Sequence, residues 1–180
     1  MVSASFRAPA WVVWWDLTRS STLIQQGQSA HLWQIFSVIN RLLEMDGFVL
    51  FAPGGDGGGY CRLSPLTFAN FSRCIHASCD IIDSVVRWRN SDRLFEDIFV
   101  RIAIVFAPTI DVYRLHTRGV KGITCYGEGI VTAQRRCHQA PRDRDVVMVD
   151  EAILHSLNPP VSSLISLLRN HPFVVLDSGR

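Results

Sequence analysis

Two aspartates stand where a site for divalent metals could form. Asp16 follows the apolar run 11–15, which predicts a buried strand, and Asp56 lies within the glycine-rich segment 54–59. If the first strand and this hairpin are neighbours in one sheet, both carboxylates lie at the same sheet end. Taken singly, Asp16 is also explained as a helix cap and Asp56 as a turn residue. Together, two carboxylates offer the hard oxygen ligands that bridge a metal to phosphate oxygens.

The segment directly after Asp16 could receive an anion. Thr18, Arg19, Ser20 and Ser21 place hydroxyls, a guanidinium and backbone N–H groups at the start of a predicted helix, residues 20–26. The glycine-rich segment is not a P-loop, because no Gly-Lys-Ser/Thr follows it. A second basic segment, residues 135–144, holds four arginines and is explained either as a solvated loop or as a triphosphate contact.

Patterns typical of strands and of helices alternate along the chain, and the elements that they predict must position these residues. Apolar runs, helical spacing and turn residues predict the order β-α-α-β-β-α-β followed by further strands and helices, an α+β sheet with helices on one face. Pro108 is expected to end a buried strand. The predicted strands are residues 11–15, 48–52, 60–63, 99–107, 112–115, 122–126, 146–149 and 173–176, and the helices are 20–26, 28–45, 66–88, 129–137 and 151–157.

Composition excludes several classes of protein. The 180 residues, 48% of them hydrophobic, suffice for a single domain over residues 1–180. A net charge of +2 without a basic cluster argues against nucleic-acid binding, and the apolar runs are too short to span a membrane. The first residues lack a signal peptide, so we expect a cytoplasmic protein. The five cysteines have no Cys-x-x-Cys spacing, which favours reduced, partly buried thiols over disulfides or a zinc site.

Five segments in order resemble the catalytic domain of class III nucleotidyl cyclases. Residues 14–23 (WWDLTRSSTL) resemble the strand that carries the first metal aspartate of that family, and Gly55-Asp56-Gly57 resembles its second metal site. Residues 100–104 (VRIAI) are similar to the family's Arg-Ile-Gly-Ile strand. Residues 126–135 (YGEGIVTAQR) resemble its Trp-Gly-Asp-x-Val-Asn-x-Ala-x-Arg helix, and residues 146–151 (VVMVDE) the segment that follows.

The resemblance implies a ferredoxin-like α+β fold, mostly antiparallel, and a set of site residues. Asp16 and Asp56, with the Leu17 carbonyl, would hold two Mg²⁺ or Mn²⁺ ions, and Thr18, Arg19, Ser20 and Ser21 would bind the triphosphate. Arg135 would stabilise charge at the α-phosphate, with an exposed helix arginine as the alternative interpretation. Because the family's sites lie between two catalytic domains, a homodimer with a nucleoside triphosphate substrate is implied.

Departures from the family pattern bear on substrate and activity. The family's transition-state asparagine is Val131 here, and a phenylalanine usual at the first helix is Ser20. The positions expected to read the base are Phe51 or Ala52 and Thr124, and they lack the lysine of adenylate cyclases. Altered base pockets of this kind resemble the stand-alone bacterial pyrimidine cyclases of anti-phage signalling, with UTP favoured over CTP. The same departures fit an inactive homologue that binds a nucleotide or a partner.

Overall fold

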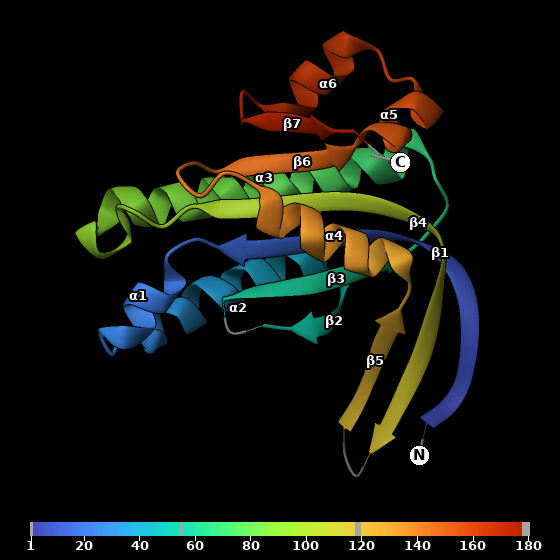
Figure 1. The fold of residues 1–180 in the computed structure, drawn as a ribbon, viewed down its shortest axis with the longest axis horizontal. Coiled ribbons are helices and arrows are strands. Elements are labelled where there is room, and N and C mark those ends of the chain that lie inside the picture. The colour runs from blue at the N-terminus through green and yellow to red at the C-terminus, as the bar shows by residue number, and fades with distance from the viewer. Residues whose placement is uncertain (1, 55, 118–119, 178–180) are drawn as a thin grey trace.

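A seven-stranded mixed sheet forms the centre of this computed structural model, which describes residues 2–54, 56–117 and 120–177 (Figure 1). The strand order is β2-β3-β1-β4-β6-β7, and β5 pairs with β4. Pairs between β4, β6 and β7 are parallel, and the others are antiparallel. The strands are β1 (Val2–Leu17), β2 (Val49–Pro53), β3 (Gly57–Leu63), β4 (Val100–Thr117), β5 (Val120–Tyr126), β6 (Val146–Asp150) and β7 (Phe173–Leu176).

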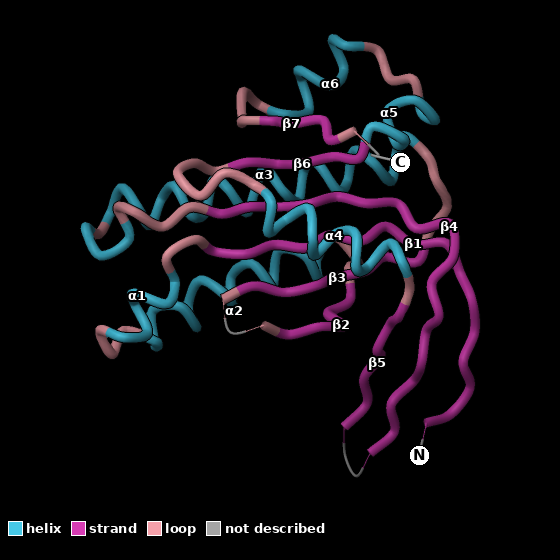
Figure 2. Tube along the Cα trace, viewed as in Figure 1, coloured by secondary structure: helices cyan, strands magenta, loops and turns pink. Residues whose placement is uncertain are grey.

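Helices cover both faces of the sheet, so the prediction of helices on one face was wrong. The larger core lies between the sheet and the helices α2 and α3, and α4 packs on the opposite face (Figure 2). From Ala10 to Leu17, β1 is covered on both faces. Its apolar run 11–15 therefore lacks the alternation of apolar and polar residues that marks a strand covered on one face only. The helices are α1 (Ser20–Gln25), α2 (Ser29–Met45), α3 (Phe68–Ser91), α4 (Glu128–Gln139), α5 (Glu151–Leu157), α6 (Val161–Leu168) and the 3-10 turn η1 (Arg93–Phe95).

The alternation of side chains along β1 determines which residues face the candidate site. Trp11, Val13 and Trp15 belong to the core against α2 and α3. Val12 and Trp14 pack with the residues on the α4 side. Because successive side chains of a strand point to opposite faces, Asp16 shares the α4 side with them.

Pro108 does not end its strand, contrary to the prediction. Strand β4 continues to Thr117 and includes the separately predicted strand 112–115. The pairing of β1 with β4 shifts register between Ala8 and Ala10, opposite this proline. A bulge tolerates a residue without a backbone N–H, which explains the continuation. Beyond it, β4, β5 and the start of β1 form an arm that bends away from the sheet (Figure 1).

Three glycines that the sequence assigned to a turn, Gly57, Gly58 and Gly59, are strand residues of β3. A Cβ on Gly59 would lie 2.5 Å from the Trp14 ring, and one on Gly57 would lie 2.4 Å from the Trp15 carbonyl oxygen. Only glycine permits such close approach, so these residues let β3 lie against β1. The turn is consequently shorter than predicted. Gly55 lies outside the described residues.

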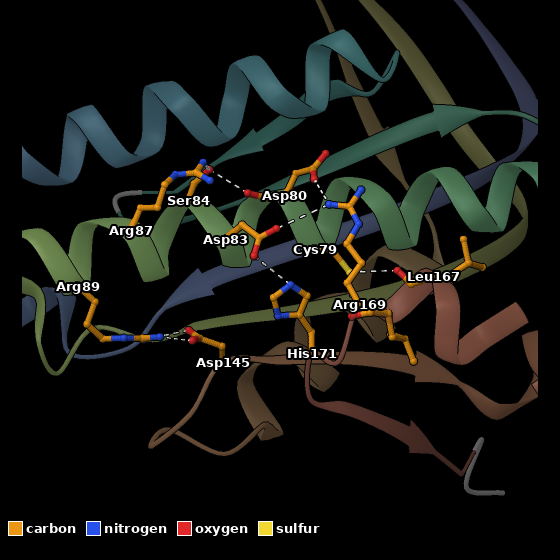
Figure 3. A network of polar contacts seen from close by, with 11 residues as sticks. Cys79, Asp80, Asp83, Ser84, Arg87, Arg89, Asp145, Leu167, Arg169 and His171 are labelled. Atoms are coloured by element: carbon orange, nitrogen blue, oxygen red, sulfur yellow. Dashed lines mark hydrogen bonds and ion pairs between the residues drawn. The ribbon is translucent and has the colours of Figure 1, made fainter. Parts of the chain in front are cut away.

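The C-terminal segment contains helix α6, which the sequence analysis missed. Its partly buried leucines Leu164, Leu167 and Leu168 pack against the core. The residues after it are tied to α3, because Arg169 lies 2.7 Å from Asp80 and His171 lies 3.2 Å from Asp83 (Figure 3). Within the described residues, no helix is long and apolar enough to cross a membrane.

Candidate active site

A cleft of about 340 Å³ opens where β1 ends beside the β2–β3 turn. It receives residues from β1, from the segment leading into α1, from β4 and from the end of α4. Acidic and basic side chains both line it, which suits a ligand that carries phosphates together with a cation. The lining residues are Asp16, Leu17, Thr18, Arg19, Ser20, Ser21, Asp56, Arg101, His138 and Arg142.

Asp16 and Arg101 form a buried ion pair at the base of this cleft. The two residues are direct neighbours in the register of β1 and β4, and the Arg101 guanidinium donates to Asp16 Oδ2. Their side chains are 11% and 5% exposed. The alternative that Asp16 caps a helix is wrong, because Arg19 occupies the N-cap position of α1, which has no side-chain cap.

Arg101 also connects the cleft to α4. Its Nη1 lies 3.2 Å from the His138 carbonyl oxygen and 3.4 Å from that of Ala140. A cation is favourable at these positions because carbonyl groups at a helix C-terminus carry partial negative charge. Sequence reasoning matched this arginine to a family strand but did not place it in the site. A charged residue inside the apolar run 100–105 was the available signal.

Asp56 meets the end of β1 through both its backbone and its side chain. Its carbonyl oxygen accepts from the Leu17 N–H at 2.9 Å, and its Oδ2 accepts from the Ser20 hydroxyl at 2.5 Å. The Ser20 hydroxyl also lies 3.2 Å from the Leu17 carbonyl oxygen. The structure thus brings Asp16, Leu17 and Asp56 to one cleft.

The charge of Asp56 is one of the influences on the pKa of Asp16. Burial raises the pKa of the Asp16 carboxyl above its ordinary value, the bond from Arg101 lowers it, and the charge of Asp56 raises it again. The net effect is a raised pKa. A divalent cation next to both carboxylates would relieve this repulsion.

The donor set fits Mg²⁺ or Mn²⁺ that arrives with a phosphate ligand. Among the described residues, all hydrogen bonds to the side chains of Asp16 and Asp56 fall on Oδ2, which leaves each Oδ1 without a protein donor. The described part of the chain holds no cluster of three or more His, Cys, Asp or Glu suited to a metal. Mg²⁺ in proteins is commonly held by one or two carboxylates, with water and substrate phosphates completing its shell.

The residues predicted to bind the triphosphate all line the cleft. They differ in how far their side chains are already bonded to other protein groups. The Thr18 hydroxyl accepts from the Phe99 N–H at 3.1 Å, so it helps to join β1 to the start of β4. The Arg19 guanidinium lies 2.6 Å from Asp97, at the cleft edge. Ser21 is exposed. Of this set, Ser20 has the clearest contact with the acidic pair.

The arginine-rich segment 135–144 was explained either as a solvated loop or as a triphosphate contact, and its arginines differ in this respect. Arg142, together with His138, lines the cleft. Arg136 instead lies 3.4 Å from Asp150, and Arg144 pairs with the adjacent exposed Asp143. One arginine of this segment is therefore placed for an anion in the same chain's cleft.

Arg135 and the predicted base-reading residues lie away from this cleft. Arg135 is exposed on α4, and Val131, one turn earlier, is 44% exposed. Phe51 is buried, with its ring centroid 6.1 Å from that of Trp14. Ala52 on β2 and Thr124 on β5 are half-buried. Within a single chain these residues cannot complete the site around Asp16.

Comparison with known proteins relates the fold to nucleotidyl cyclases. No protein-family model and no curated protein matches the sequence. Among solved structures, adenylyl cyclase CyaB from Pseudomonas aeruginosa superposes with a TM-score of 0.69 and 13% identity, covering 91% of this chain and 83% of that one. A class III adenylyl cyclase-like ATP-binding protein from the same species gives 0.69 and 14%, covering 91% of this chain and 37% of that one.

A bacterial light-regulated adenylyl cyclase gives a TM-score of 0.62 and 15% identity over 73% of this chain, which spans only 40% of that protein. Identities this low establish the fold and leave the activity to be argued from the cleft. The five sequence segments lie at the end of β1, the β2–β3 turn, β4, the start of α4 and β6. The chain therefore has the fold of the class III nucleotidyl cyclase catalytic domain.

Proposed function

We propose that this protein is a metal-dependent nucleotidyl cyclase, which converts a nucleoside triphosphate to its 3′,5′-cyclic monophosphate and pyrophosphate. The carrying observation is the meeting of Asp16 and Asp56 in one cleft that also contains Arg101 and Arg142. Carboxylates suit a divalent cation, and the Arg142 guanidinium suits the phosphates that it accompanies. The fold supports this activity by analogy.

In this reaction the ribose 3′-oxygen attacks the α-phosphorus, the bond to the β-phosphate oxygen breaks, and the 3′-hydroxyl proton leaves to solvent. Two divalent cations held by Asp16 and Asp56, with the Leu17 carbonyl, would supply acidification of that hydroxyl and neutralisation of the leaving pyrophosphate. Arg142 binds phosphate oxygens from the cleft wall. Arg101 is buried and bonded to Asp16, so it holds that carboxylate in place. Ser20 holds the Asp56 carboxylate through its 2.5 Å hydrogen bond.

The complete site requires a second copy of the chain. Arg135 is exposed on α4 and absent from the lining of its own chain's cleft, which supports a role for it in the cleft of a partner. There it would stabilise charge developing at the α-phosphate. We therefore propose a homodimer with two sites. Exposed Val131, on the same helix, would lie at that interface.

For the base, we propose a pyrimidine, with UTP favoured. The residues at the predicted base positions are Phe51, Ala52 and Thr124, and none of them can donate a charged hydrogen bond to a purine. One aromatic ring and one hydroxyl suit a smaller base read by stacking and a neutral hydrogen bond. A cyclic pyrimidine nucleotide would then serve as a second messenger, in keeping with the resemblance to anti-phage cyclases.

A second candidate function is nucleotide binding without turnover. Arg101 occupies one oxygen of Asp16, and Val131 cannot hydrogen-bond a ribose. One structural neighbour is itself described as a cyclase-like ATP-binding protein. Such a protein would be stabilised by a triphosphate without releasing pyrophosphate.

The test is to incubate the purified protein with Mn²⁺ and each of ATP, GTP, CTP and UTP separately, and to resolve the products by mass. A cyclic pyrimidine nucleotide is the expected product. A cyclic purine would overturn the base assignment and retain the cyclase. Thermal stabilisation by a triphosphate without any product would establish the second candidate and overturn the first.

A further inference from the structure

Two buried cysteines from separate strands touch on the α4 side of the sheet. The Cys61 sulfur on β3 lies 3.5 Å from the Cys125 sulfur on β5, and each residue is no more than 4% exposed. In the part of the chain that the structure describes, no backbone ladder joins these two strands: β3 pairs with β1 and β2, whereas β5 pairs with β4. Side chains alone therefore join the arm to the hairpin at this point.

The remaining cysteines have different surroundings. Cys79 approaches the Leu167 and Leu168 carbonyl oxygens at 3.6 and 3.7 Å, and Cys137 donates to the Arg101 carbonyl at 3.2 Å. Among the described residues, only Cys61 and Cys125 have sulfur atoms within hydrogen-bond distance of each other.

We propose that Cys61 and Cys125 form a site of reversible oxidation, which a hydroperoxide converts to a disulfide. The contact distance requires the sulfurs to move about 1.5 Å closer to reach disulfide length. Both cysteines lie on strands that only side-chain packing joins, so this approach breaks no backbone pair between them. Neither the metal cleft nor a nucleotide is needed for the reaction.

The chemistry begins at Cys125. The hydrogen bond from Cys61 lowers the pKa of Cys125, whereas that bond and burial raise the pKa of Cys61. The Cys125 thiolate attacks one peroxide oxygen, the O–O bond breaks, and hydroxide leaves to take up a proton. Cys61 sulfur then attacks the resulting sulfenic acid, loses its own proton, and releases water. Two thiols and one hydrogen peroxide thus give one disulfide and two waters.

The bond would fix the strands that carry the proposed base-reading residues. Cys125 directly follows Thr124, and both cysteines pack in the same cluster as Phe51. Oxidation would therefore set the spacing between β5 and the β2–β3 hairpin and change substrate turnover. This consequence rests on the proposed function, whereas formation of the disulfide does not.

The test treats the folded protein with hydrogen peroxide, blocks remaining thiols under denaturing conditions, and maps peptides by mass without reductant. We expect a linked peptide pair containing Cys61 and Cys125, the loss of two hydrogen atoms from the intact mass, and reversal by dithiothreitol. Cys61→Ala and Cys125→Ala should each abolish the link, whereas the matched control Cys79→Ala should retain it. Closing so long a loop should raise the Tm by roughly 5 °C or more.

Retention of all five free thiols after peroxide, or oxidation of single cysteines without a link, would overturn the proposal. A different linked pair would overturn it as well. These results on the wild-type chain hold even if a variant fails to fold. A Cys61–Cys125 link in a protein without cyclase activity would support the oxidation site while the proposed function fails.

Discussion

Two buried aspartate–arginine pairs lie at the two sides of the β4 start, and they differ in what surrounds the carboxylate. Asp145 receives Arg89 at both oxygens (Figure 3). Its Oδ1 also accepts from the Val100 N–H at 2.9 Å. Asp16 receives Arg101 at one oxygen only and opens onto the cleft. The two carboxylates are similarly buried, but both oxygens of Asp145 are bonded to protein donors, whereas Asp16 keeps one oxygen available.

The arginines differ in the same way. Arg89 completes its contacts with the Ile98 carbonyl at 2.8 Å and the Phe99 ring, whose centroid is 4.6 Å from its guanidinium carbon. Arg101 contacts the end of α4 and lines the cleft with Arg142. A buried ion pair is by itself weak evidence of stabilisation or of function. The unused oxygen of Asp16 and the open cleft are therefore what distinguish the candidate site from the Asp145 pair.

The largest expected effect separates the pairs by activity. Asp16→Asn keeps the size and a hydrogen-bond acceptor for Arg101 but removes the charge that binds the cation. We expect cyclic nucleotide formation per folded molecule to fall by about 100-fold or more, with an unchanged far-UV circular dichroism spectrum. The Tm should fall, because Arg101 loses its counter-charge, but by less than in Asp16→Ala, because the hydrogen-bond acceptor remains. Asp16→Ala is the poorer test, because it leaves Arg101 buried without a partner. Wild-type turnover by Asp16→Asn would remove Asp16 from the metal site.

The free energy of unfolding should fall more when Asp145 is replaced than when Asp16 is replaced by Asn. Asp145→Ala strands a largely buried guanidinium and the Val100 N–H, so we expect the free energy of unfolding to fall by about 3–5 kcal/mol. Denaturation with urea, followed by circular dichroism, measures this loss. Activity per folded molecule should stay near that of the wild type. A selective loss of activity in a stable variant would erase the contrast between the pairs.

A smaller effect, specific to Asp16, is expected in the pH dependence of stability and of Mn²⁺ affinity. Because burial raises the pKa of Asp16 in the folded chain, the folded state takes up this proton before the unfolded state does. The group therefore stabilises the fold fully below its ordinary pKa of about 4, and this contribution is lost as pH rises through the raised value. Mn²⁺ affinity should change oppositely and weaken as pH falls through that value, because the proton competes with the cation.

Mn²⁺ titrations at a series of pH values, from the ordinary carboxyl pKa upward, measure that competition. Asp16→Asn serves as the matched control, since it cannot titrate. Identical pH dependence in the wild type and this variant would show that Asp16 does not compete for the cation.

The smallest effect is expected at the exposed pair beside the cleft. Arg19 and Asp97 have side chains 55% and 65% exposed, so their interaction is screened by water. Arg19→Gln should shift the Tm by less than about 2 °C. If Arg19 binds the triphosphate, the KM for substrate should rise several-fold with little change in kcat. An unchanged KM would limit Arg19 to a surface contact.

The sequence predicted the acidic pair because its cues are local. The apolar run before Asp16 and the glycines around Asp56 indicate a strand end and a turn, and both features are in the structure. Arg101 was not assigned to the site, because its position follows from the β1–β4 register over 85 residues of separation. No local pattern specifies such a register.

The errors in the fold have equally particular causes. A proline normally interrupts a strand, but here it falls at a register shift where its missing N–H costs nothing. The glycines of β3 look like turn residues until the Trp14 ring is placed against them. Helix α6 was not predicted, because it has only eight residues. Its leucines pack against a core formed by residues distant in the sequence, which no local pattern reveals.

The measurement that tests the central claim most directly is cyclic nucleotide formation from UTP and Mn²⁺ by the wild type and by Asp56→Asn. Asp111→Asn, which alters an exposed carboxylate paired with Arg7, is the control. We predict cyclic UMP from the wild type and from the control, and at least about a 100-fold loss in Asp56→Asn at equal folded fraction. Equal product from all three proteins would contradict a metal site at Asp16 and Asp56.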